Sequence, residues 1–160
     1  MPEAQPHIST TMTIESEWID YNGHFNMAYY GVLFDRAADQ MFAAVGLGPD
    51  YVKSTNNSFF TLETHCSYLR EVQPTDKVTI SSQIIDHDHK RVHYVQQMHG
   101  PDAQVACILE VMVSHVDLTT HKTSNFPHDV KARIDAMAGE HRAVHVPAQV
   151  GHKIGIPRKT

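Results

Sequence analysis

Cysteine is scarce in this sequence. Only two of the 160 residues are cysteines, Cys66 and Cys107. Both lie within apolar, strand-like runs, and no Cys-x-x-Cys spacing occurs, so the sequence indicates neither a disulfide scaffold nor a zinc knuckle. Two isolated thiols favour a protein of the reducing cytoplasm.

Positive charge and long apolar runs are also lacking. The formal net charge is -5, and no basic run exceeds Lys90-Arg91 or Arg158-Lys159, which argues against a nucleic-acid partner. No apolar run approaches membrane-spanning length, and residues 1–6 have neither the basic nor the apolar region of a signal peptide. We therefore expect an unprocessed cytoplasmic protein with no membrane segment.

Histidine, in contrast, is abundant, with 13 residues. Several of them surround a predicted hairpin: His87, His89, His93 and His99. The sequence contains no His-Glu-x-x-His motif and no clear third ligand near these histidines. The spacing therefore predicts solvated hairpin residues and no metal site.

Hydrophobic periodicity predicts one long helix over residues 26–46, because apolar residues recur there every three or four positions. Asn26 is a suitable N-cap, and the glycines and proline of residues 46–49 supply a stop. A first strand is predicted before the helix, over Ile8 to Trp18. Residues 54–57 are predicted to form a polar connection after it.

The remainder of the chain is mostly strand. Strands are predicted over residues 58–72, 77–86, 91–98 and 104–118. The second and third of these form a hairpin, and the fourth is apolar enough for a central strand buried on both faces. Residues 129–138 are predicted to form a short peripheral helix.

This order of elements predicts an α+β protein with the hotdog fold. An antiparallel five-stranded sheet must wrap around the single long helix to bury its apolar face. One domain would occupy residues 1–145, with residues 146–160 as a C-terminal surface arm. One side of such a sheet stays uncovered, so we expect a homodimer or a dimer of dimers with sites between protomers.

Polar chemistry is concentrated in the segment Trp18-Ile-Asp-Tyr-Asn-Gly-His-Phe-Asn26, directly ahead of the long helix. The first turn of a helix has unpaired N–H groups and the positive end of the dipole, which favour a carboxylate or a developing oxyanion. The segment is therefore the first candidate for a catalytic site.

This segment, extended through Met-Ala-Tyr-Tyr30, resembles the Asp-x-x-Gly-His-x-Asn-x-x-x-Tyr signature of hotdog thioesterases of the 4-hydroxybenzoyl-CoA thioesterase type. The resemblance covers residues 7–120. A closer similarity is to the thioesterases found beside, or fused to, L-carnitine dehydrogenase. Three further motifs carry it: Phe60-Thr-Leu-Glu-Thr-His65, Tyr68-Leu-Arg-Glu-Val72 and His87-Asp-x-Lys-Arg-x-His93. The resemblance implies hydrolysis of an acyl-CoA, with betainyl-CoA as the substrate and no cofactor beyond the coenzyme A of the substrate itself.

Asp20 is the first candidate catalytic residue, because thioester hydrolysis needs a carboxylate nucleophile or a carboxylate that deprotonates water, and the sequence has no serine or cysteine nucleophile motif. The family counterpart has that role. The sequence does not separate nucleophile from general base. The alternative is that Asp20 only caps its own turn.

Gly23, His24 and Asn26 complete the candidate loop. Gly23 permits close approach of the backbone to a thioester carbonyl, and a neighbouring N–H could donate to the oxyanion. The His24 imidazole could orient Asp20 or polarise the carbonyl, or it could hydrogen-bond within a tight loop. Asn26 is more simply an N-cap than a substrate contact, although it could be both.

Glu63 is a carboxylate in an otherwise apolar strand, where an unpaired charge is costly, so we expect it to have a partner. Across a dimer, Glu63 with Thr64 or His65 could activate water or hold a cationic acyl group. Alternation places Thr61 on the face of Glu63 and Thr64 on the other, unless a bulge intervenes. The alternatives are a solvated edge position or a pair with an arginine such as Arg91.

Aromatic residues near the motif bear on the acyl group, because aromatic faces attract quaternary ammonium. Trp18, Tyr21 and Tyr30 are the candidates for such a cage, with helix-to-sheet packing as the alternative. Arg91 is a candidate for the CoA phosphates, with a solvated hairpin charge as its alternative.

The sequence therefore predicts an acyl-CoA thioesterase with Asp20, His24 and Glu63 as catalytic residues. A medium-chain or aromatic acyl-CoA hydrolase is the alternative within the same class. A hotdog dehydratase and a non-catalytic acyl-CoA binding protein are the alternatives from other classes.

Overall fold

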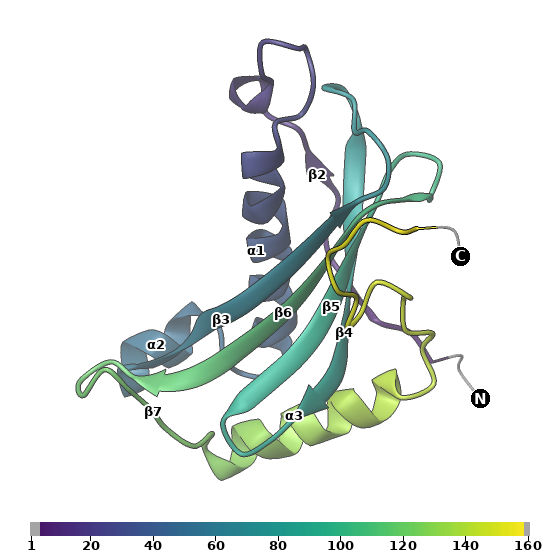
Figure 1. Cartoon of the computed structure of the whole chain (residues 1–160). Coiled ribbons are helices and arrows are strands. Elements are labelled where there is room, and N and C mark those ends of the chain that lie inside the picture. Colours follow the sequence, from purple (N-terminus) through teal and green to yellow (C-terminus); the bar gives the residue numbers. More distant parts are fainter. Residues whose placement is uncertain (1–3, 159–160) are drawn as a thin grey trace.

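The computed structural model describes residues 4–158 and contains one antiparallel sheet with three α-helices in this part of the chain (Figure 1). The main path of the sheet has five strands in the order β1-β4-β5-β6-β3, while β2 pairs with β4 and β7 with β6. The strands are β1 (His7–Ile8), β2 (Met12–Thr13), β3 (Asn57–Tyr68), β4 (Lys77–His87), β5 (Arg91–His99), β6 (Val105–Asp117) and β7 (Lys122–Thr123). Three residues of the predicted domain and two of the predicted arm lie outside the described range.

Helix α1 (Met27–Ala44) confirms the predicted long helix. It begins at Asn26, whose side chain accepts a hydrogen bond from the N–H of Ala28 at 2.9 Å, so the predicted N-cap is confirmed. One face of the helix is fully buried against the sheet, including Leu33, Phe34 and Met41. Figure 1 shows the strands crossing in front of α1, which lies behind the sheet in this view.

Two local predictions are wrong. The strand expected over Ile8 to Trp18 is divided into β1, β2 and the 3-10 helix η1 (Ser16–Trp18). The polar connection expected over residues 54–57 is reduced to Asn56, because helix α2 (Pro49–Thr55) extends through Thr55 and β3 begins at Asn57. Pro49 occupies the first turn of α2, where a proline is well tolerated. Helix α2 ends at Asn56, which adopts the left-handed conformation.

The predicted hairpin and central strand are confirmed. Strands β4 and β5 pair along their length, and β6 lies between β5 and β3. β3 ends at Tyr68, four residues before the predicted end, and pairs only with β6 among the described strands. β3 is therefore the edge of the sheet, and the large side chains of Phe60, Leu62 and Tyr68 are exposed along it.

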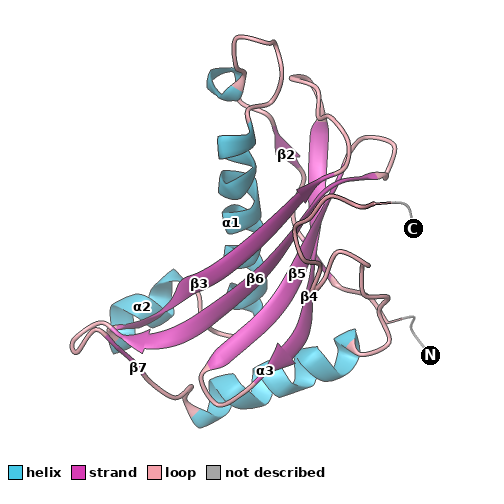
Figure 2. Ribbon diagram, in the orientation of Figure 1, coloured by secondary structure: helices cyan, strands magenta, loops and turns pink. Residues whose placement is uncertain are grey.

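The second face of the sheet is covered differently from the first. Helix α3 (His128–His141), longer than the predicted 129–138, lies at one end of the sheet (Figure 2). It contacts both β4 and α1, because His141 Nδ1 accepts a hydrogen bond from the Ile84 N–H at 2.9 Å and Arg133 Nε donates to the Val45 carbonyl at 2.9 Å. Residues 146–158 contain no helix or strand and cross the face of the sheet opposite α1. The N–H of Gly151 donates to Glu110 Oε2 on β6 at 2.8 Å, which fixes this segment to the sheet. We call this side, opposite α1, the outer face.

Candidate active site

The loop ahead of α1 is a tight hairpin. Ile19 and Phe25 form an antiparallel bridge, and inside it the N–H of Asp20 donates to the carbonyl of His24 at 2.9 Å. The N–H of Gly23 donates to the Asp20 carbonyl at 2.9 Å, with Gly23 at φ 75°, a conformation that side chains disfavour. The loop is thus held by its own backbone directly beside the start of the helix.

The Asp20 carboxylate is half-buried in this hairpin. Its Oδ1 accepts hydrogen bonds from the N–H of Asn22 at 2.9 Å and of His24 at 3.3 Å, which is the turn-capping arrangement weighed as the alternative to catalysis. Within residues 4–158, no donor holds Oδ2. One oxygen is therefore fixed by the turn while the other remains available for chemistry.

His24 does not contact the Asp20 carboxylate through its ring. Its Nε2 lies 2.9 Å from Glu71 Oε1, and both side chains are about half exposed. Glu71 lies in the connection between β3 and β4, so the pair ties that connection to the loop. The sequence reasoning did not select Glu71 as a site residue, although the motif Tyr68-Leu-Arg-Glu-Val72 contains it.

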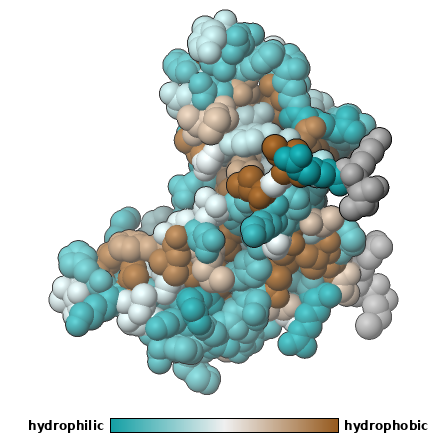
Figure 3. Space-filling model, viewed as in Figure 1, coloured by the Kyte–Doolittle hydropathy of each residue, from teal (hydrophilic) through white to brown (hydrophobic). Residues whose placement is uncertain are grey.

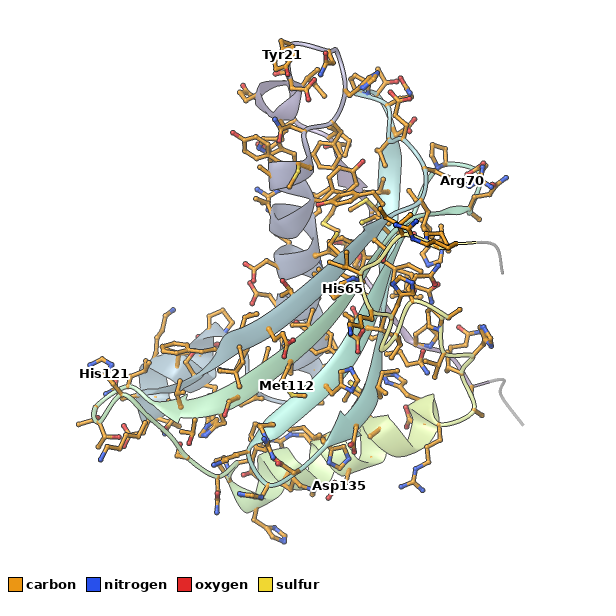
Figure 4. All side chains as sticks on the ribbon, in the orientation of Figure 1. Tyr21, His65, Arg70, Met112, His121 and Asp135 are labelled. Atoms are coloured by element: carbon orange, nitrogen blue, oxygen red, sulfur yellow. The ribbon has the colours of Figure 1, made fainter. Side chains whose placement is uncertain are left out.

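The aromatic residues pack with one another and do not form a cage around an open space. Trp18 and Tyr30 are buried, at 7% and 5% exposure, while Tyr21 is 98% exposed at the tip of the loop (Figure 4). Tyr30 stacks on Phe25 at a centroid distance of 4.2 Å, and burial raises the pKa of its hydroxyl to about 12. The guanidinium of Arg36 lies 5.2 Å from the Trp18 ring and occupies one of its faces. Within one chain, Trp18 and Tyr30 therefore pack in the core, as in the alternative to the aromatic cage, and Tyr21 lies apart from both.

A bulge in β3 lies between Thr61 and Glu63. The register shifts at Leu62, so Thr61 pairs with Val113 and Thr64 with Val111, while Glu63 pairs with Met112. Because paired residues share a face, Thr61 and Thr64 both lie on the α1 side, where Val111 and Val113 are buried. The prediction that Thr61 shares a face with Glu63 is wrong for this reason.

Glu63 itself lies on the outer face and is exposed to solvent, so the expected charge partner is not formed within the described chain. It lines a groove of about 580 Å³ between the sheet and the C-terminal segment, together with His65, His93, Glu110 and Met112. In this groove the His93 Nε2–H donates to Glu110 Oε1 at 2.7 Å. Figure 4 shows His65 and Met112 on this side of the sheet. Within one chain, Glu63 and Asp20 thus belong to different surfaces.

Arg91 is engaged at the β4–β5 hairpin. Its Nη2 and Nε contact Asp88 Oδ2 at 2.6 and 2.8 Å. Although partial burial opposes the shift, hydrogen bonds from the backbone of Lys90 and from Arg91 hold the pKa of Asp88 well below its usual range. An intramolecular pair with Asp88 therefore competes with the predicted phosphate contact of Arg91.

No group of three His, Cys, Asp or Glu side chains in residues 4–158 is arranged to hold a metal ion. None of the helices in that range combines the length and the apolar character needed to cross a bilayer.

Comparison with known proteins assigns the chain to a family. The model of the thioesterase-like superfamily matches residues 14–134, and the chain therefore belongs to this family of thioester hydrolases. The chain is 38% identical over 142 residues to the betainyl-CoA thioesterase of Pseudomonas aeruginosa. The matched residues cover 88% of this chain and 89% of that protein.

Two further similarities extend the comparison. The chain is 29% identical to part of the L-carnitine dehydrogenase/betainyl-CoA thioesterase of Rhizobium meliloti, and the match spans 91% of this chain and 29% of that longer protein. A hypothetical protein of Staphylococcus aureus, solved in complex with CoA, superposes with a TM-score of 0.90 at 30% identity over 98% of this chain and 99% of that one. The predicted hotdog thioesterase family is thus confirmed.

Proposed function

We propose that this protein hydrolyses betainyl-CoA to betaine and CoA. The observation that carries the proposal is the 38% identity to a betainyl-CoA thioesterase over nearly the full length of both chains. The loop geometry supports it, because the Asp20 carboxylate lies in the hairpin that leads into α1, with one oxygen free of hydrogen bonds from the described residues. Coenzyme A enters as part of the substrate, and the proposed chemistry requires no other cofactor.

Asp20 drives the reaction by one of two routes. As a nucleophile, Oδ2 attacks the thioester carbonyl, the C–S bond breaks, and water then hydrolyses the mixed anhydride. As a general base, Oδ2 takes a proton from the water that attacks the carbonyl, and the C–S bond then breaks as the CoA thiolate leaves and takes up a proton. In both routes the carbonyl oxygen becomes an oxyanion, which backbone N–H groups between Gly23 and the first turn of α1 can stabilise.

We further propose that the working form is a homodimer or a dimer of dimers in the cytoplasm. Strand β3 supports this proposal, because it leaves one edge unpaired among the described strands and exposes Phe60, Leu62 and Leu69 beside it. The roles predicted for Glu63 and Arg91 require such a partner, since neither residue lies at the Asp20 loop of its own chain.

Release of free thiol from three substrates tests the proposal: betainyl-CoA, butyryl-CoA and a 3-hydroxyacyl-CoA. We expect betainyl-CoA to be hydrolysed with the highest kcat/KM. Preference for butyryl-CoA would indicate the medium-chain alternative. Loss of water from the 3-hydroxyacyl-CoA to give the enoyl-CoA, without thiol release, would indicate a dehydratase. CoA binding with no turnover of any of the three would contradict an enzymatic function.

A further inference from the structure

Two thiols that the proposed hydrolysis does not use lie side by side on the α1 face of the sheet. Cys66 is on β3 and Cys107 is on β6, and their Sγ atoms are 3.3 Å apart. Cys66 pairs in register with Leu109 and Cys107 pairs with Tyr68, so the cysteines are diagonal neighbours on one face. A disulfide bond is about 2.05 Å long, so the two Sγ atoms must approach by roughly 1 Å to form one.

The two thiols differ in access and acidity. Cys107 is fully buried, whereas Cys66 is half-buried. The pKa of Cys66 is lowered to about 7, mainly by the hydrogen bond with Cys107. The Tyr68 hydroxyl lowers this pKa further, and partial burial opposes the shift. The same hydrogen bond and burial raise the pKa of Cys107. Cys66 is thus the thiolate that reacts first, and Cys107 is placed to resolve the product.

We propose that Cys66 and Cys107 form a peroxide-sensitive dithiol site that a hydroperoxide converts to an intramolecular disulfide. The Cys66 thiolate attacks one peroxide oxygen, the O–O bond breaks, and Cys66 becomes a sulfenic acid as hydroxide or an alkoxide leaves and takes a proton from solvent to give water or an alcohol. The Cys107 sulfur then attacks the Cys66 sulfur. The S–S bond forms, the S–O bond breaks, and hydroxide leaves with the Cys107 proton as water. Two electrons pass from the thiols to the peroxide, and an external dithiol reverses the change.

The position of the pair connects it to the candidate active site. Cys107 belongs to the core cluster that contains Trp18, Phe25 and Tyr30 of the loop and helix start. Tyr68, two residues after Cys66, packs edge-on against Tyr30 at 5.1 Å and donates a hydrogen bond to the Met27 carbonyl at 3.4 Å. Drawing β3 toward β6 would shift these contacts, and displacements of order 1 Å at a site can cost up to ~100-fold in rate. We expect the disulfide form to lose about tenfold in kcat/KM and to regain it on reduction.

The test is mass spectrometry of the full chain after treatment with one equivalent of hydrogen peroxide and alkylation in denaturant. We expect loss of two hydrogen atoms, a peptide containing Cys66 linked to one containing Cys107, and full reversal by dithiothreitol. Two free, alkylatable thiols after peroxide, or a link only between separate chains, would overturn the site. Unchanged thioesterase activity in the linked form would overturn its coupling to the active site. The mass result does not depend on the substrate, so it is independent of the proposed function.

Single substitutions provide matched controls. In Cys107→Ala, Cys66 is expected to gain oxygen atoms and to form no intramolecular link, because its resolving thiol is gone. In Cys66→Ala, the buried Cys107 is expected to stay unmodified at the same peroxide dose. Oxidation of Cys107 in that variant would contradict the assigned order. If either variant fails to fold, peptide mapping of the unsubstituted chain still decides the proposal.

Discussion

The two faces of the sheet differ in the side chains that they carry: the α1 face is a buried apolar core, and the outer face is mainly hydrophilic. On the α1 face, Leu33 and Phe34 of the helix are 0% and 1% exposed, and they pack with strand residues such as Ile80 and Met98. On the outer face, Figure 3 shows apolar patches among mainly hydrophilic side chains. There, Glu110 holds His93 and the C-terminal segment through hydrogen bonds.

This comparison teaches that titratable side chains on the two faces have different partners. The outer-face carboxylate of Glu110 is used for docking, with both oxygens occupied. The Asp20 carboxylate keeps one oxygen without a donor from the described chain, in the hairpin that precedes α1. Five predictions follow, from the largest expected effect to the smallest, and the first four test this division directly.

Asp20→Asn should cause the largest loss. Removing the carboxylate abolishes both the nucleophile and the base, so kcat should fall by about 10²–10⁴-fold with betainyl-CoA. Thiol release measured at saturating substrate checks this. Asp50→Asn, at an exposed position in α2, is the matched control and should stay within about twofold of the unsubstituted enzyme.

Glu63→Gln tests whether a carboxylate of the outer face contributes to the reaction. Because Glu63 lies on the outer face, its substitution should change kcat by less than about tenfold, and any effect should require the assembled dimer. A loss as large as that of Asp20→Asn would show that a partner subunit brings the two surfaces together.

Phe34→Ala tests the α1 face as the stabilising core. The side chain is fully buried, so its removal should lower the free energy of unfolding by about 3–5 kcal/mol. Phe60→Ala, at 47% exposure on the edge strand, should cost much less. Chemical denaturation of both variants measures the difference, and equal losses would contradict the assignment of the core.

Glu110→Ala tests the docking of the C-terminal segment. It leaves the N–H of Gly151 without its acceptor, which should cost about 1–2 kcal/mol and loosen the segment. Limited proteolysis after Lys153 should become faster, while Glu140→Ala, at an exposed position of α3, should leave cleavage unchanged. Unaltered cleavage in Glu110→Ala would mean that other contacts hold the segment.

His141 should give a smaller, pH-dependent effect. Burial lowers its pKa; the negative charge of Glu140 opposes this shift and nearby His7 reinforces it. Its Nδ1 accepts a hydrogen bond from the Ile84 N–H at 2.9 Å, which requires the neutral ring. Below pH ~6.5 the unfolded chain binds a proton that the folded chain does not, so stability should fall as pH decreases through that range.

Thermal unfolding between pH 7.5 and 5 measures this dependence. In His141→Gln, the melting temperature should fall less between pH 7.5 and 5 than in the unsubstituted chain, although the variant is less stable at pH 7.5. His145→Gln, at an exposed position, should keep the slope of the unsubstituted chain. Identical slopes in all three would exclude His141 as a source of the pH dependence.

The sequence by itself determined the long helix, its Asn26 cap, the four long strands and the hairpin between β4 and β5. These features follow from local rules, namely periodicity, capping and turn residues, which act over a few neighbouring positions. The family signature also located the Asp20 loop correctly ahead of the helix.

Only the tertiary structure decided which side chains share a surface. The bulge at Leu62 moved Thr61 to the α1 face, Arg36 occupied the Trp18 ring, and Glu71 reached His24 from a distant connection. Each of these depends on strand register or on contacts between segments far apart in the chain. A change of one residue in register turns every following side chain to the opposite face, and no local pattern records it.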